Sequence, residues 1–157
     1  MTIRLIEMKD VQQVAEWERE IAILSFGDEA ITDLAFHMRK LEKAAQYEPA
    51  GMLVWETAEY LAGWMWMSKR VNSVTQEAYI HLKSFFIREV YRGTPGGRDL
   101  FGTGMQWAIN EGCRHILGHV NVHNMPMRAL YEKYGFAPTH LTMEFRVSPT
   151  EKDEQID

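Results

Sequence analysis

Residues 87–98 read Ile-Arg-Glu-Val-Tyr-Arg-Gly-Thr-Pro-Gly-Gly-Arg, and this stretch decides the fold. It follows a predicted strand at 77–87 and precedes a predicted helix at 98–111, with a glycine-rich turn at 92–97 between them. The first N–H groups of a helix have no partner inside the helix, and the helix dipole adds positive potential there. A strand, a glycine-rich turn and a helix therefore suit an anion such as a phosphate, although many such turns only connect two elements. A Walker loop and a dinucleotide-binding fingerprint are both excluded by the glycine spacing.

A second segment, residues 124–136, reads Asn-Met-Pro-Met-Arg-Ala-Leu-Tyr-Glu-Lys-Tyr-Gly-Phe. Together the two segments resemble the GNAT superfamily of acetyl-CoA-dependent N-acetyltransferases. The family has a strand ending in Val or Ile, then Arg-Gly-x-Gly-x-Gly and a helix, and later an Asn, a Leu-Tyr pair and Gly-Phe. The matching positions are Ile87, Arg92, Gly93, Gly97, Leu100, Asn124, Leu130, Tyr131, Gly135 and Phe136.

The order of elements predicted along the chain is β-α-α-β-β-β-α-β-α-β-β, which is also the order of this family. The resemblance implies a mixed α+β fold with about seven strands in a central sheet and about four helices. The predicted strands are 2–7, 51–56, 60–69, 77–87, 116–122, 136–140 and 141–147, and the predicted helices are 9–25, 31–46, 98–111 and 124–134. We expect one domain over residues 1–149 and a disordered acidic tail at 150–157.

Composition limits the class of protein. The chain has 157 residues, of which 46% are apolar and 25% charged, as in a globular protein. Its formal charge is −5, and residues 151–157 carry −3 of it, so the remainder is near −2 and nucleic-acid binding by bulk charge is excluded. No apolar run reaches the length of a membrane span, and the first residues lack the layout of a signal peptide. The single cysteine, Cys113, favours the reducing cytosol.

The resemblance implies that acetyl-CoA is the co-substrate. Its pantetheine arm would bond to the backbone of Phe85, Phe86 and Ile87, with the Ile87 N–H on the thioester carbonyl. Pro95 takes the place of the family's middle glycine and has no N–H. The pyrophosphate would then depend on the remaining amides of the turn, which are those of Gly93, Thr94, Gly96, Gly97 and Arg98. Cations that could serve the phosphates are Arg92, Arg98, Arg128 and Lys133.

The same resemblance implies the catalytic groups. Tyr131 takes the position of the general acid, and its phenol is protonated at neutral pH. The alternative is an aromatic ring packed on the inner side of its helix. Asn124 is an N-cap, a cofactor contact, or both. The general base of histone-type members lies six residues before the strand-terminal Val or Ile, which gives His81 here. A water chain is the alternative base.

Two further inferences concern histidines and strand faces. Strict alternation places His81, Lys83, Phe85 and Ile87 on one face of their strand. The histidines at 115, 119 and 123 are spaced by four residues, but in a strand the last two would lie roughly 13 Å apart, too far for one ion. The sequence therefore predicts no metal.

The resemblance implies an acceptor that is a primary amine of a small molecule or peptide, and this amine would attack the thioester directly in a ternary complex. Asp28 and Glu29 lie in the segment between the first two helices (25–29). They would attract a cationic amine, or they are simply solvated residues at a helix N-terminus. The resemblance implies that residues 138–143 are the other segment that sets specificity. Three tryptophans, Trp55, Trp64 and Trp66, would line an aromatic cleft or pack in the core. The alternative function is a non-catalytic acyl-CoA-binding module. We expect no nucleic-acid or membrane partner, and the resemblance suggests a homodimer.

Overall fold

The computed structural model describes residues 2–147. The tail predicted at 150–157 lies outside the described residues. The chain forms two compact units, one ending at His119 and the other starting at Val120. The single domain expected over residues 1–149 stays a prediction.

The first unit holds a five-stranded sheet in the order β1-β2-β3-β4-β5. Its strands are β1 (Thr2–Leu5), β2 (Met52–Glu56), β3 (Leu61–Val71), β4 (Ala78–Ile87) and β5 (Ile116–Gly118). Its α-helices are α1 (Val11–Phe26), α2 (Leu34–Tyr47) and α3 (Pro95–Asn110). The first four strands are antiparallel to their neighbours, whereas β4 and β5 are parallel. The predicted mixed α+β fold is therefore confirmed, with fewer strands than expected.

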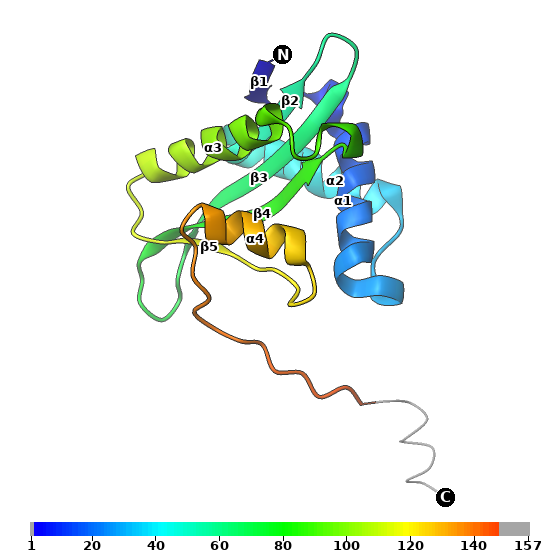
Figure 1. The fold of residues 1–157 in the computed structure, drawn as a ribbon. Coiled ribbons are helices and arrows are strands. Elements are labelled where there is room, and N and C mark those ends of the chain that lie inside the picture. Colours follow the sequence, from blue (N-terminus) through cyan, green and yellow to red (C-terminus); the bar gives the residue numbers. More distant parts are fainter. Residues whose placement is uncertain (1, 148–157) are drawn as a thin grey trace, which may run out of the picture. The chain divides into compact units, whose positions relative to one another are not determined.

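Helices cover both faces of the sheet, with α3 on one face and α1 and α2 on the other (Figure 1). Central strand β3 is consequently buried from Leu61 to Ser68. The face under α1 and α2 holds an aromatic cluster that includes Trp17, Trp64 and Phe86. None of the described helices is both long and apolar enough to cross a membrane.

Glycine permits the closest packing between α3 and the sheet. A Cβ at Gly104 would overlap the end of the Met65 side chain, so glycine lets the helix lie near β3 without moving that flexible side chain. Close packing thus accounts for a glycine inside the helix, where it otherwise costs about 1 kcal/mol relative to alanine.

The second unit begins with a turn and contains α4 (Met125–Lys133). The Asn124 side chain accepts a hydrogen bond from the Met127 N–H at 3.2 Å, so Asn124 is the N-cap of this helix. Gly135, with φ +87°, stops it, as Gly112 does after α3 with φ +78°. Both helices therefore end at a glycine in the left-handed conformation.

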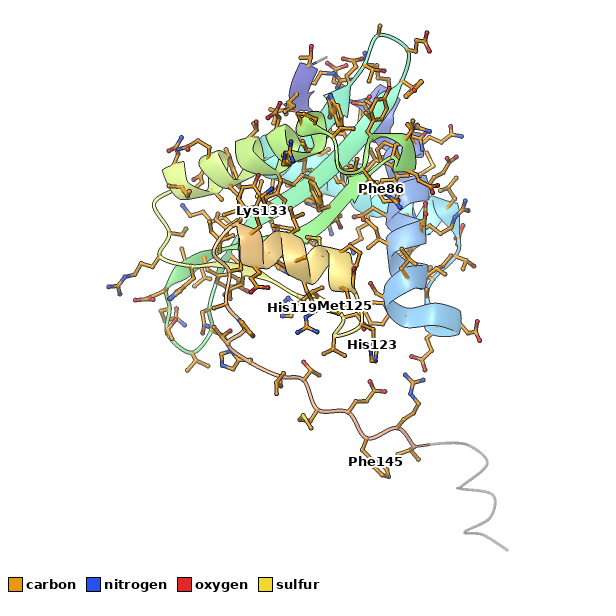
Figure 2. The ribbon with its side chains drawn as sticks, in the orientation of Figure 1. Phe86, His119, His123, Met125, Lys133 and Phe145 are labelled. Atoms are coloured by element: carbon orange, nitrogen blue, oxygen red, sulfur yellow. The ribbon has the colours of Figure 1, made fainter. Side chains whose placement is uncertain are left out.

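Three predictions of element bounds were wrong. Helix α3 begins at Pro95 rather than near Arg98, because proline at the first helical position has a suitable fixed φ and lacks an N–H that the helix does not need. Strand β5 has three residues instead of seven. Residues 136–147 form no strand, and their apolar side chains, including Phe145 at 86% exposure, lack the burial that would stabilise a strand pair (Figure 2).

Candidate functional site

The site begins with an edge of β4 that has no strand partner. Strand β4 pairs with β3 up to Ile87, but with β5 only over Ile80–Leu82. The Arg88 N–H donates to the Ala62 carbonyl in β3 at 2.8 Å. Because backbone groups alternate sides along a strand, the Ile87 amide points away from β3, toward the β5 side. After Leu82, no described strand pairs with that side of β4.

A β-bulge at Lys83 sets which amides face this edge. Ser84 pairs with Trp66 and Leu82 pairs with Met67, so Lys83 is one residue too many on β4. Before the bulge the Ile80 N–H donates to the His115 carbonyl at 3.0 Å, on the β5 side. Before the bulge, the even-numbered residues of β4 therefore point their amides to the β5 side. After the bulge, the odd-numbered residues do so.

The bulge also divides the side chains that strict alternation placed on one face, so that prediction was wrong. Phe85 meets Phe101 of α3 edge-on, with ring centroids 5.1 Å apart. Ile87 lies beside Gly97, also on the α3 face. The Lys83 ammonium instead lies 3.9 Å from the centre of the Trp66 ring, on the face of α1 and α2. His81 is on that second face too, since its neighbour Leu82 pairs with Met67, which contacts α3.

The start of α3 presents fewer amides than predicted. Thr94 is the N-cap, but its N–H and its hydroxyl both donate to the Tyr91 carbonyl, at 3.2 and 2.6 Å. Pro95 has no N–H, and the amide of Arg98 is the first to find its acceptor within the helical pattern. The amides of Gly96 and Gly97, at the second and third helical positions, are left for an anion.

Packing explains the first of the two neighbouring glycines, Gly96, but not the second, Gly97. A Cβ on Gly96 would overlap the indole of Trp55, whose ring also meets Tyr91 edge-on at 5.2 Å. A Cβ on Gly97 would make only ordinary contacts with Ile87, at 3.6 Å and beyond. Gly93 needs to be glycine for a different reason, since its φ is +77°. Gly96, where the family accepts any residue, is thus required by the neighbouring indole in this chain.

Arg92 connects the turn to the strand end. Its Nε donates to the Ile87 carbonyl at 2.9 Å, and its guanidinium carbon lies 5.5 Å from the centre of the Phe86 ring. The terminal guanidinium nitrogens make no hydrogen bond to any other residue in the described part of the chain. They are therefore placed to bind a phosphate beside the open edge of β4.

The environment of His81 makes it a weak base. Burial, with the nearby charges of His119 and Lys83, lowers the pKa of His81 to about 4. Its ring meets that of His119 edge-on at 5.3 Å. The imidazole is neutral at pH 7 and has a lone pair, but it holds an accepted proton poorly.

The sequence reasoning missed Glu18. This residue of α1 accepts hydrogen bonds from the Ser84 hydroxyl at 2.8 and 2.9 Å to its two carboxylate oxygens. Burial raises the pKa of Glu18 above its usual value. The signal was present in the sequence, because a helix that buries Val14, Trp17 and Ile21 also turns position 18 toward the sheet.

The second unit carries the remaining predicted residues. Tyr131 is 7% exposed and packs its ring on Phe136 at 4.8 Å, and burial raises the pKa of Tyr131 to about 12. The phenol is therefore protonated at neutral pH, as a general acid must be. Arg128 donates to the Val122 carbonyl at 2.8 Å, and Lys133 lies in the last turn of α4.

Metal ligands do not gather in the described residues, where no three His, Cys, Asp or Glu side chains lie close enough to hold an ion. Of the three histidines with four-residue spacing, His119 contacts His81, and the backbone N–H of His123 donates to the Asn121 side chain at 2.9 Å.

A mixed sheet with a short parallel strand pair, beside a glycine-rich helix start, places the protein in the α+β class. The sequence matches the acetyltransferase (GNAT) family over residues 11–136, and the chain belongs to that family.

Relatives with assigned names are acetyltransferases. The chain is 34% identical over 83 residues to the uncharacterised N-acetyltransferase YycN of Bacillus subtilis, a match covering 53% of this chain and 52% of that protein. It is 28% identical over 109 residues to mycothiol acetyltransferase of Corynebacterium glutamicum, covering 68% of this chain and 36% of the relative. The match thus spans about half of the first relative and about a third of the second.

Solved structures share the fold. A mutant protein from Bacillus halodurans superposes with a TM-score of 0.76 at 19% identity, covering 94% of this chain and all of that one. The aminoglycoside antibiotic 6'-N-acetyltransferase of Acinetobacter haemolyticus superposes with a TM-score of 0.70 at 14% identity. The match covers 94% of this chain and 99% of that one.

Proposed function

We propose that this protein is an acetyl-CoA-dependent N-acetyltransferase that acts on a primary amine of a small molecule or peptide. The observation that carries the proposal is the open edge of β4 from Lys83 to Ile87, next to the start of α3. An extended pantetheine arm fits such an edge as a substitute strand, and the amides of Gly96 and Gly97 suit its diphosphate. The positive φ of Gly93 shapes the turn that leads into this helix start.

The residues of the first unit hold and polarise the donor in this proposal. When bound, acetyl-CoA supplies an acyl group on a good leaving thiol. The Ile87 amide donates to the thioester carbonyl, where negative charge develops during acyl transfer. Arg92 and Arg98 provide positive charge for the phosphates, while Phe85 and Phe86 contribute the strand that the arm lies along.

Tyr131 is the proposed general acid that protonates the departing thiolate. This assignment rests on its position in the motif and on its chemistry, since a phenol whose pKa is about 12 stays protonated at every physiological pH. Asn124 supports the same helix as its N-cap. His81 remains a candidate base, although its depressed pKa makes it a poor one.

The test is thiol release from acetyl-CoA with a panel of amines, comparing the unaltered protein with Tyr131→Phe. We expect amide formation that falls about 100-fold in the variant, because a lost general acid typically costs 10² to 10⁴ in rate. A thermal shift with CoA, and a smaller one with CoA lacking its ribose phosphate, would measure binding separately. Binding without turnover on every amine would instead favour a non-catalytic acyl-CoA-binding module. Cytoplasmic location and a homodimer stay predictions.

A further inference from the structure

Helix α1 is aligned along β4 by three contacts. Arg88 donates to the Gln13 side chain at 3.4 Å, Trp17 stacks on Phe86 with centroids 5.0 Å apart, and Ser84 donates to Glu18. In these three contacts, increasing residue numbers in α1 meet decreasing residue numbers in and just after β4. The helix and the strand therefore run antiparallel. This alignment brings the Glu18 carboxylate to the first residues of β4 beyond its pairing with β5.

The carboxylate of Glu18 is removed from bulk water, yet the residue as a whole keeps partial exposure. Burial raises the pKa of Glu18, and the Ser84 hydrogen bond and the charges of Lys40, Lys83 and His37 oppose the rise without cancelling it. A carboxylate whose pKa is raised and which a hydrogen bond from Ser84 holds in place has the properties of a general base.

Positive charge beside Glu18 also suits an amine substrate. The ammonium groups of Lys83 and Lys40 lie 3.9 and 5.6 Å from the centre of the Trp66 ring. Neither lysine forms an ion pair with a described residue. Nearby cations disfavour the ammonium form of an incoming amine, so they favour the neutral nucleophile.

The position of His81 is less favourable. His81 lies before the bulge, in the part of β4 that β5 still covers, where it pairs with Leu117. Its ring is turned against His119. Glu18 contacts Ser84, which lies after the bulge and three residues before Ile87.

We propose that Glu18 accepts the proton of the acceptor amine, which binds on the α1–α2 face of β4 beside its open edge. The inference rests on the proposed function. The amine nitrogen forms a bond to the thioester carbon and gives its proton to the Glu18 carboxylate, directly or through one water. The carbon–sulfur bond breaks, and the thiolate receives the proton of Tyr131.

The test is the pH dependence of kcat/KM for Glu18→Gln, which keeps the volume and can still accept from Ser84. We expect kcat/KM at pH 7 to fall about 100-fold and the acid limb of the profile to disappear. Glu20→Gln makes the same change on an exposed position of the same helix and should alter neither. Glu18→Asp retains a carboxylate and should recover part of the rate with the acid limb intact.

The outcomes separate the two proposals. An unaltered rate and acid limb in Glu18→Gln, while the unaltered protein makes amide, would reduce Glu18 to a packing role and leave the enzyme assignment standing. Failure of the unaltered protein to acetylate any amine would overturn both. If Glu18→Gln does not fold, Ser84→Ala serves instead: loss of its hydrogen bond should move the acid limb to higher pH, and an unmoved limb would contradict the role.

Discussion

The indole of Trp55 occupies the space in which a Cβ of Gly96 would lie. This contact joins β2 to the first turn of α3, the turn whose amides we assign to a diphosphate. It accounts for a glycine at a position where the family pattern does not ask for one.

Gly96→Ala should destabilise the protein by about 1–3 kcal/mol, because the added methyl group must displace a packed ring. Gly97→Ala is the matched control, since its Cβ meets only ordinary contacts and alanine is the better helix former. Urea unfolding of both variants checks this. Equal midpoints for the two variants would contradict the steric role of Trp55.

Arg92→Met should weaken CoA binding about tenfold, which corresponds to about 1.4 kcal/mol. The variant loses a charge for the phosphate and the Nε donor that ties the turn to the Ile87 carbonyl. The measurement is the CoA-induced rise in melting temperature, with exposed Arg114→Met as the control for loss of charge. Equal rises in both variants would remove Arg92 from the site.

Tyr131 should make stability fall at alkaline pH. Its pKa is about 12 in the folded protein and about 10 when unfolded, so the folded state holds this proton more tightly. The stabilisation is complete below pH 10 and is lost as pH rises toward 12, a change of about 2–3 kcal/mol. The free energy of unfolding, measured in urea between pH 9 and 11, should fall less steeply with pH for Tyr131→Phe than for Tyr79→Phe. Parallel curves would contradict the burial of the phenol.

His81 should contribute to acid sensitivity. Its pKa is about 4 in the folded protein and about 6.5 when unfolded, so the unfolded chain binds this proton first as pH falls. The stabilisation from the neutral form is present above pH 6.5 and disappears as pH drops toward 4. Melting temperatures of His81→Asn should decline less over that window than those of the exposed control His140→Asn. An NMR titration that finds His81 charged at pH 6 would refute this.

Local sequence rules predicted well where the physics is local. Gly112 and Gly135 end their helices because a residue with positive φ closes the last turn. Asn124 caps α4 because its side-chain oxygen reaches an amide three residues later. The strand pair predicted at 136–147 does not form, because its stability depends on distant parts of the chain. An alternating pattern yields a strand only where another surface buries one of its faces.

The bulge at Lys83 could not be predicted in this way. It exists only as a difference in register between β3 and β4, and it moves Phe85 and Ile87 to the face opposite Lys83. Glu18 was missed for a related reason. The periodicity of α1 turns position 18 toward the sheet, but only the structure shows that its partner there is Ser84, 66 residues away.

The sequence by itself determined the family, the order of helices and strands, and the turn that presents amides at the start of α3, because these depend on residue types at fixed spacing. The tertiary structure decided which face each side chain of β4 occupies, how far β5 accompanies it, and which carboxylate reaches its open edge. Those features arise from pairing and packing between distant segments, where a shift of one residue reverses every orientation that follows.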